Sequence, residues 1–130
     1  MRATAISMAA VLILTGAVCV LSMHYITGVS SRMEGLHGQA LEYAQAGEAD
    51  EARRMLEEMK RLWTRQEGRL ALLFLHEEID GIGGMLIEAQ CSFEGEDEAA
   101  FVCSMAHLRE ALERMQANER FSLSNILRLC

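Results

Sequence analysis

Two short patterns carry the residues that could bind a metal or move a proton. His76 and Asp80 stand four residues apart, and so do Cys103 and His107. On a helix this spacing puts both members of a pair on one face, and these side-chain types can bind zinc. If the chain folds back near Gly95, however, the two pairs are out of step along the helix axis. We therefore expect no metal site and no cofactor.

The same fold-back predicts other partners for these side chains. It places Asp80 opposite about Arg109, and His76 opposite about Glu113. The first hypothesis is a polar lock between the two helices, in which His76 bonds either Glu113 or a backbone carbonyl. The alternative is a pocket near His76 and Asp80 that binds a small molecule or an ion. Acid–base catalysis also requires a cleft and a reacting group, and the sequence shows neither, so we expect no enzyme.

A long charge-free segment precedes everything else. From Ala3 to Ser31 the chain carries no Asp, Glu, Lys or Arg. About 20 apolar residues suffice for a helix to cross a bilayer, so the segment predicts a membrane span. The span divides the chain into an anchor, residues 1–31, and a soluble domain, residues 32–130.

The anchor is expected to be retained rather than cleaved. Gly28-Val29-Ser30 offers a small-residue cleavage site, but the apolar run continues to Ile26 and is long for a signal peptide. Arg2 is the basic residue that precedes the run. Because positive charge favours the cytoplasmic side, we expect the N-terminus inside and a single-pass protein of the cell membrane with its domain outside.

The composition of the soluble part indicates an all-α domain. The chain has no proline, and good helix formers dominate it. Its net charge of −7 disfavours nucleic acid as a partner. The charge is also segregated, with basic residues concentrated at 53–69 and only acids at 70–108. The two regions either attract each other within the domain or steer a partner protein.

Apolar periodicity predicts four or five antiparallel helices after the span. We expect Gly47 to end the first helix and Trp63 to lie in the core. The run LALLFL at 70–75 is apolar all round and predicts a helix start buried on several sides. Glycines at 81, 83 and 84 suggest a close helix crossing or a kink. The expected helices are Met33–Ala46, Ala49–Gln66, Leu70–Gln90, Glu98–Ala117 and a short piece, Phe121–Leu129, that lies back on the bundle.

The cysteines and the acidic turn carry weaker signals. Cys91 and Cys103 flank a predicted turn, so either a disulfide or two free thiols is possible outside the cell. The acids between Glu94 and Glu98 lack the ligand spacing of a calcium-binding EF-hand loop. We expect them to stabilise the start of the next helix instead.

Two resemblances follow from these elements. The spacing of Tyr43, Gly47, Ala52 and Leu56 resembles the helix junction of a tetratricopeptide repeat, which implies a helical hairpin. Nearly the whole chain resembles the membrane-anchored bacterial family filed as domain of unknown function 4363. The features that carry this second resemblance are the N-terminal anchor, a helix ending at Trp63, the run from Leu73 to Asp80, an acidic turn and the segment Leu123–Leu127.

The family resemblance implies a bacterial membrane protein and no assigned activity. His76, Asp80 and Asn125 match its motif positions, and we expect them, with Arg109, to make structural polar contacts rather than bind a ligand. The predicted function is a non-catalytic module, held in the lipid bilayer, that binds another membrane protein or a second copy of itself. The alternative is an extracytoplasmic sensor with its pocket near His76 and Asp80.

Overall fold

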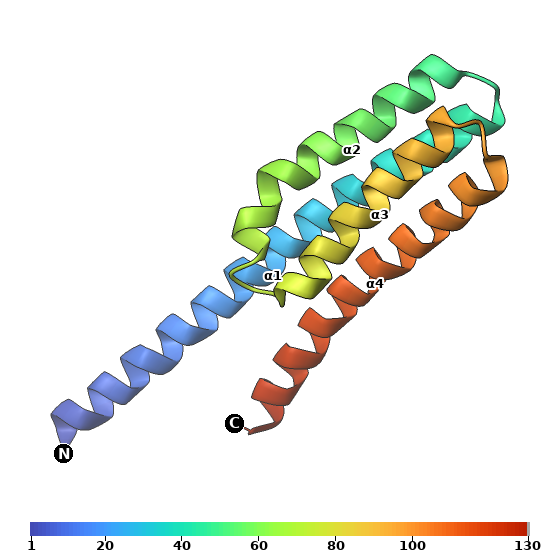
Figure 1. Ribbon diagram of the computed structural model, residues 1–130. Helices are drawn as coiled ribbons and strands as arrows, with labels where there is room; N and C mark the ends of the chain where they lie inside the picture. The colour runs from blue at the N-terminus through green and yellow to red at the C-terminus, as the bar shows by residue number, and fades with distance from the viewer. Residues whose placement is uncertain (130) are drawn as a thin grey trace.

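The computed structural model describes the backbone of residues 1–129, and the side chains of these residues apart from Arg2 and 119–129. Over this range the chain forms the all-α bundle that was predicted (Figure 1). Successive helices run in opposite directions. α1 packs against α2 and α4, and α3 packs against the same two helices, which closes a four-helix ring. The helices are α1 (Arg2–Gln45), α2 (Ala49–Leu70), α3 (His76–Glu94) and α4 (Glu98–Leu129).

α1 joins two different environments in one unbroken helix of 44 residues. Its N-terminal half projects from the bundle (Figure 1), and its most apolar window has a mean hydropathy of 2.3 and is not buried at all. This helix is long and apolar enough to cross a membrane. Burial begins at Ile26 and continues at Val29, Met33 and Ala40, a spacing that places these residues on one face. Three of the residues predicted as anchor, Ile26 among them, therefore pack in the bundle.

The core is built from one apolar stripe on each helix. The periodic apolar residues that predicted a helix at 49–66 are buried along α2, and Trp63, with 2 % of its surface exposed, lies in the core as expected. Of the three glycines in α3, Gly83 faces this tryptophan, because a β-carbon there would lie 3.6 Å from Trp63 Nε1. Gly83 therefore lies at the contact between α3 and α2, whereas a β-carbon at Gly81 or Gly84 would meet no atom within 4 Å. The α2 stripe consists of Ala52, Met55, Leu56, Met59, Leu62, Trp63 and Leu70.

The boundary between α2 and α3 corrects the sequence prediction. The run at 70–75 does not begin a buried helix: α2 continues to Leu70, and α3 begins at His76. Leu70 is fully buried and completes the α2 stripe, but Leu72 and Leu75 are 85 % and 72 % exposed in the turn that follows. Each helix of the ring contacts only two other helices. One side of every helix therefore faces solvent, and a segment that is apolar all round cannot be buried on all sides.

α4 provides a second correction. The segment Phe121–Leu129 was predicted as a separate helix lying back on the bundle, but the backbone of α4 continues through it to Leu129 without a turn. The end of α4 therefore reaches toward the side of the bundle from which α1 emerges (Figure 1). Asn125 lies in this stretch, outside the residues whose side chains are described.

Two short turns close the opposite end of the bundle. Gly47 adopts φ +79°, a left-handed conformation that glycine tolerates, and so ends α1 as predicted. The N–H of Glu48 donates to the Tyr43 carbonyl at 2.9 Å across this turn. At the start of α4, Asp97 Oδ1 accepts a hydrogen bond from the N–H of Ala100 at 3.0 Å. This is the helix-starting role expected for the acidic run.

Candidate functional site

A pocket of about 290 Å³ opens between the two turns, at the end of the bundle far from the N-terminus of α1. We call it the distal pocket. It is formed where the end of α1, the start of α2, the end of α3 and the start of α4 come together. Its lining residues are Leu41, Ala44, Gln45, Ala49, Arg53, Ser92, Phe93, Glu94, Glu96, Asp97, Glu98, Phe101 and Val102.

The floor of the distal pocket is apolar. Phe93 and Phe101 pack with their ring centroids 5.2 Å apart and their planes at 57°, a favourable tilted arrangement. Phe101 is 4 % exposed and belongs to the core, whereas Val102 beside it is 51 % exposed at the rim. The floor is thus held rigidly by the core, with an aliphatic side chain open to solvent at its edge.

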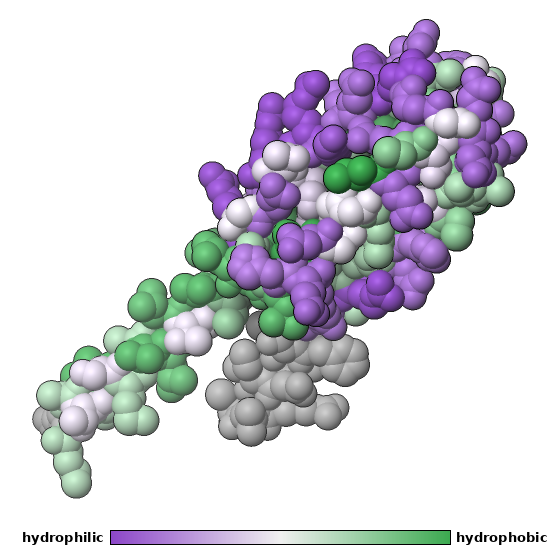
Figure 2. Space-filling model, in the orientation of Figure 1, coloured by the Kyte–Doolittle hydropathy of each residue, from purple (hydrophilic) through white to green (hydrophobic). Residues whose placement is uncertain are grey.

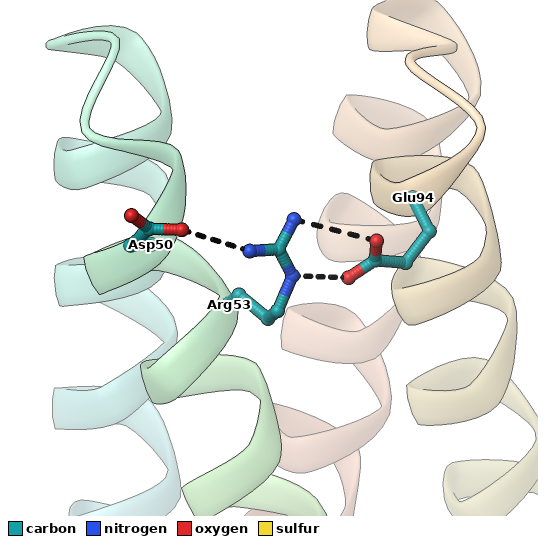
Figure 3. A network of polar contacts seen from close by, with 3 residues as sticks. All are labelled: Asp50, Arg53 and Glu94. Carbon is teal, nitrogen blue, oxygen red and sulfur yellow. Dashed lines mark hydrogen bonds and ion pairs between the residues drawn. The ribbon is translucent and has the colours of Figure 1, made fainter.

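An ion-pair network shapes one side of the rim (Figure 3). Arg53 Nε lies 2.5 Å from Glu94 Oε1, and Arg53 Nη1 lies 3.0 Å from Asp50 Oδ1. The hydrogen bond and the charge of Glu94 raise the pKa of Arg53 above its ordinary value. Its charge therefore does not change over the physiological pH range, and the network tethers α2 to α3 without acting as a pH switch. Because the network is exposed, it orients Glu94 more than it stabilises the fold.

The rim as a whole is acidic. Glu94, Glu96, Asp97 and Glu98 all line the pocket, and Arg53 is the one basic residue among the lining residues. That arginine already pairs with two carboxylates. The distal pocket therefore combines an apolar floor with a surplus of negative charge, which suits a ligand group that is both cationic and apolar.

The polar lock predicted at the other end of α3 does not form. His76 and Asp80 are both exposed, and Arg109 Nε donates instead to Glu113 Oε1 on its own helix, at 3.1 Å. The buried face of α3 consists of Ile79, Ile82, Leu86 and Ala89. Asp80 follows Ile79 directly and so points away from α4. The predicted pairing failed because it matched positions along the axis without fixing the rotation of the helices.

A shallower hollow of about 160 Å³ lies beside these residues, between α3 and α4. Neither His76 nor Asp80 lines it, and Arg109 does not either. The interhelical polar contact nearest to it joins Asn118 Nδ2 to Glu78 Oε1 at 3.5 Å. The hollow is lined by Glu77, Glu78, Gly81, Ile82, Met85, Ala111, Arg114 and Met115.

The thiols and the second predicted pair lie on the surface. Cys103 Sγ is 4.0 Å from His107 Nε2 on the exposed side of α4. Cys91 and Cys103 are free and exposed. Within the part of the chain that the structure describes, no three His, Cys, Asp or Glu side chains converge as a metal site would require.

A buried histidine was missed by the sequence analysis. His37 is 6 % exposed, and its Nε2 lies 2.6 Å from the backbone carbonyl oxygen of Met105. Since the carbonyl can only accept, Nε2 carries the proton. This bond ties α1 to α4 inside the core. Its burial could have been predicted from its position, four residues after Met33 and three before Ala40, which places it on the buried stripe of α1.

Comparison with known proteins identifies one matching family. It provides no related protein from which a functional site could be inferred. A family described as "Domain of unknown function (DUF4363)" matches residues 20–126. The match begins in the projecting half of α1 and extends into α4. No curated protein matches the chain, and no solved structure does.

The buried and exposed histidines provide a matched test of this geometry. His37→Ala removes an interhelical hydrogen bond and leaves the Met105 carbonyl facing a cavity, so we expect it to lower the free energy of unfolding by about 1–3 kcal/mol. His76→Ala, at an exposed position, should change it by less than about 0.5 kcal/mol. Urea unfolding of the full-length protein in detergent, followed by the fluorescence of Trp63, measures both. A larger loss for His76→Ala would contradict the assignment.

Proposed function

This chain belongs to the DUF4363 family, and we propose that it is a non-catalytic bacterial membrane protein that presents its helical bundle to a partner protein at the cell surface. The observation that carries this proposal is the continuity of α1. One helix supplies both the apolar span and a quarter of the bundle. A hinge between the two parts would let the bundle tumble, whereas a continuous helix holds it in one orientation.

In the proposed orientation, the distal pocket lies at the end of the bundle away from the lipid. From Tyr25, near the first buried position of α1, to Gln45 at its end the helix rises about 30 Å. The distal pocket lies at that far end, where a partner protein can reach it. Arg2 before the span favours a cytoplasmic N-terminus and hence an extracytoplasmic bundle.

The chemistry of the distal pocket favours a protein segment that carries a lysine or arginine beside an apolar side chain. The apolar group would contact the floor formed by Phe93 and Phe101, and the cation would face Glu96 and Glu98 on the rim. The same residues argue for binding rather than catalysis. Ser92 is the one hydroxyl-bearing residue in the lining, and no histidine lines the pocket to activate it.

A small organic cation is the second candidate ligand. The volume of about 290 Å³ is close to the lower limit for pockets that hold small molecules. A cation-binding site of this kind would keep the sensor hypothesis. It would lie in the distal pocket, at the opposite end of the bundle from His76 and Asp80.

The exposed thiols test the orientation. In a Cys19→Ser, Cys130→Ser background, a maleimide that cannot cross membranes should label Cys91 and Cys103 in intact bacterial cells expressing the full-length protein. The additional replacement of Cys91 and Cys103 by serine is the control and should abolish labelling. Labelling that appears only after the cells are lysed would place the bundle in the cytoplasm and contradict the proposed topology.

Photo-crosslinking tests the binding site itself. Val102 and Ile87 are both 51 % exposed, but only Val102 lines the distal pocket. A photoreactive phenylalanine analogue at position 102 should give a discrete protein adduct in native membranes, and the same analogue at position 87 should not. Glu96→Gln with Glu98→Gln should weaken the adduct because it removes two of the rim charges.

The size and pattern of the adducts distinguish the outcomes. An adduct of twice the chain's mass identifies a second copy as the partner. Equal adducts at positions 87 and 102, or none at position 102, would overturn the assignment of the distal pocket as the protein-binding site. An adduct lost on adding small organic cations would favour the sensor variant.

A further inference from the structure

The exposed apolar side chains of the described residues gather at one end of the molecule. Most lie on the projecting half of α1, before Ser22. Among the other residues whose side chains are described, the turn between α2 and α3 has three: Leu72, Leu73 and Leu75, exposed by 85 %, 41 % and 72 %. The other two, Ile87 and Val102, are isolated on helix surfaces. Figure 2 shows hydrophobic surface at the end of the bundle where α1 emerges, continuous with that of α1.

The height of this turn can be fixed against α1. The hydroxyl of Tyr25 donates to Gln66 Oε1, so these residues lie at the same level of the bundle. α2 runs antiparallel to α1 (Figure 1), and Leu70 comes four residues after Gln66. The end of α2 therefore lies about 6 Å further along, toward the N-terminus of α1. At that level α1 is within its charge-free apolar run.

Four of the five backbone N–H groups from Ala71 to Leu75 are hydrogen-bonded within the turn or to the end of α2. The N–H groups of Leu73 and Phe74 donate to the Leu70 carbonyl, each at 2.9 Å, and those of Ala71 and Leu72 bond back into the last turn of α2. Unsatisfied N–H groups are what makes most loops costly to place in lipid. Leu70 and Phe74 pack on the core, so the turn is held in place while its leucines point outward.

We propose that this turn inserts Leu72, Leu73 and Leu75 into the bilayer beside α1. The inference rests on the proposed membrane anchoring, and it adds a second contact of the bundle with lipid. Glu77 and Glu78 follow the turn and keep its insertion shallow, at the boundary between headgroups and acyl chains. With two contacts to lipid, α1 and the turn, the bundle would have a fixed height above the membrane and could not rotate about the axis of α1.

The flanking charges favour lipid over a partner protein as the occupant. Arg65 and Arg69 are exposed on the last turns of α2, with Glu67 exposed between them, and the two guanidinium groups precede the leucines along the chain, at the level where headgroup phosphates would lie. Basic side chains next to exposed apolar ones are typical of segments that lie in a membrane interface.

Spin-label accessibility tests the proposal on the full-length protein. A cysteine-free background is made by serine substitution, and one label is placed at Leu72→Cys or Leu75→Cys in lipid nanodiscs. Power saturation then compares collisions with oxygen, which concentrates in lipid, with collisions with a water-soluble nickel chelate. Leu14→Cys in the span is the lipid reference, and Ile87→Cys is the water reference. We expect both turn positions to favour oxygen, as Leu14 does.

Each outcome decides between the possibilities. Nickel collisions at the Ile87 level for both turn positions would overturn the insertion, while an oxygen-rich Leu14 would leave the anchor intact. Low collision with both reagents would show that protein covers the turn, which also overturns the proposal. A water-accessible Leu14 would instead refute the membrane anchoring on which the proposal rests.

Discussion

The structure depends on one constraint: α1 must stay one continuous helix although its first half is apolar and exposed and its second half packs in a protein core. α1 meets it by changing its pattern rather than its conformation. Its first half is apolar on every side, and from Ile26 onward only one face is buried. Because the backbone hydrogen bonds are continuous across the change, the direction of the span also sets the direction of the bundle.

The two ends of the bundle follow from this arrangement. Even-numbered helices return toward the span, so the turn between α2 and α3 lies beside it, and the other two turns meet at the far end. The near end carries exposed leucines without charges among them. The far end carries carboxylates over a floor of two phenylalanines. Inside the bundle, apolar stripes are joined by the hydrogen bonds of His37 to α4 and of Tyr25 to α2, and the exposed ion pairs add little stability.

The sequence predicted most of the fold because its helices are amphipathic with a regular period. The α2 stripe, the buried Trp63 and the glycine at position 47 all depend on local spacing, and all were found where expected. The run at 70–75 was misinterpreted for a physical reason. A continuous apolar segment has the same composition whether it is buried in a core or exposed in a turn, and only the packing of the neighbouring helices distinguishes the two.

The candidate site was less predictable. His76, Asp80 and Arg109 are noticeable in sequence because they are polar residues beside apolar stripes, but a change of about 100° per residue moves such a side chain from the core to solvent. His37 was overlooked because its burial depends on the rotation of α1. The distal pocket exists only where two turns far apart in the sequence meet, and local spacing contains no information about that meeting.

We propose that the projecting half of α1 and its half within the bundle form one rigid helix. The most direct test is a distance measurement between spin labels at Leu14→Cys and Glu42→Cys in the full-length, otherwise cysteine-free protein in nanodiscs. A continuous helix over these 28 steps predicts a narrow distribution centred at about 42 Å. A broad distribution, or one centred at a clearly shorter distance, would show a hinge between the projecting half of α1 and the bundle and would contradict a rigid α1.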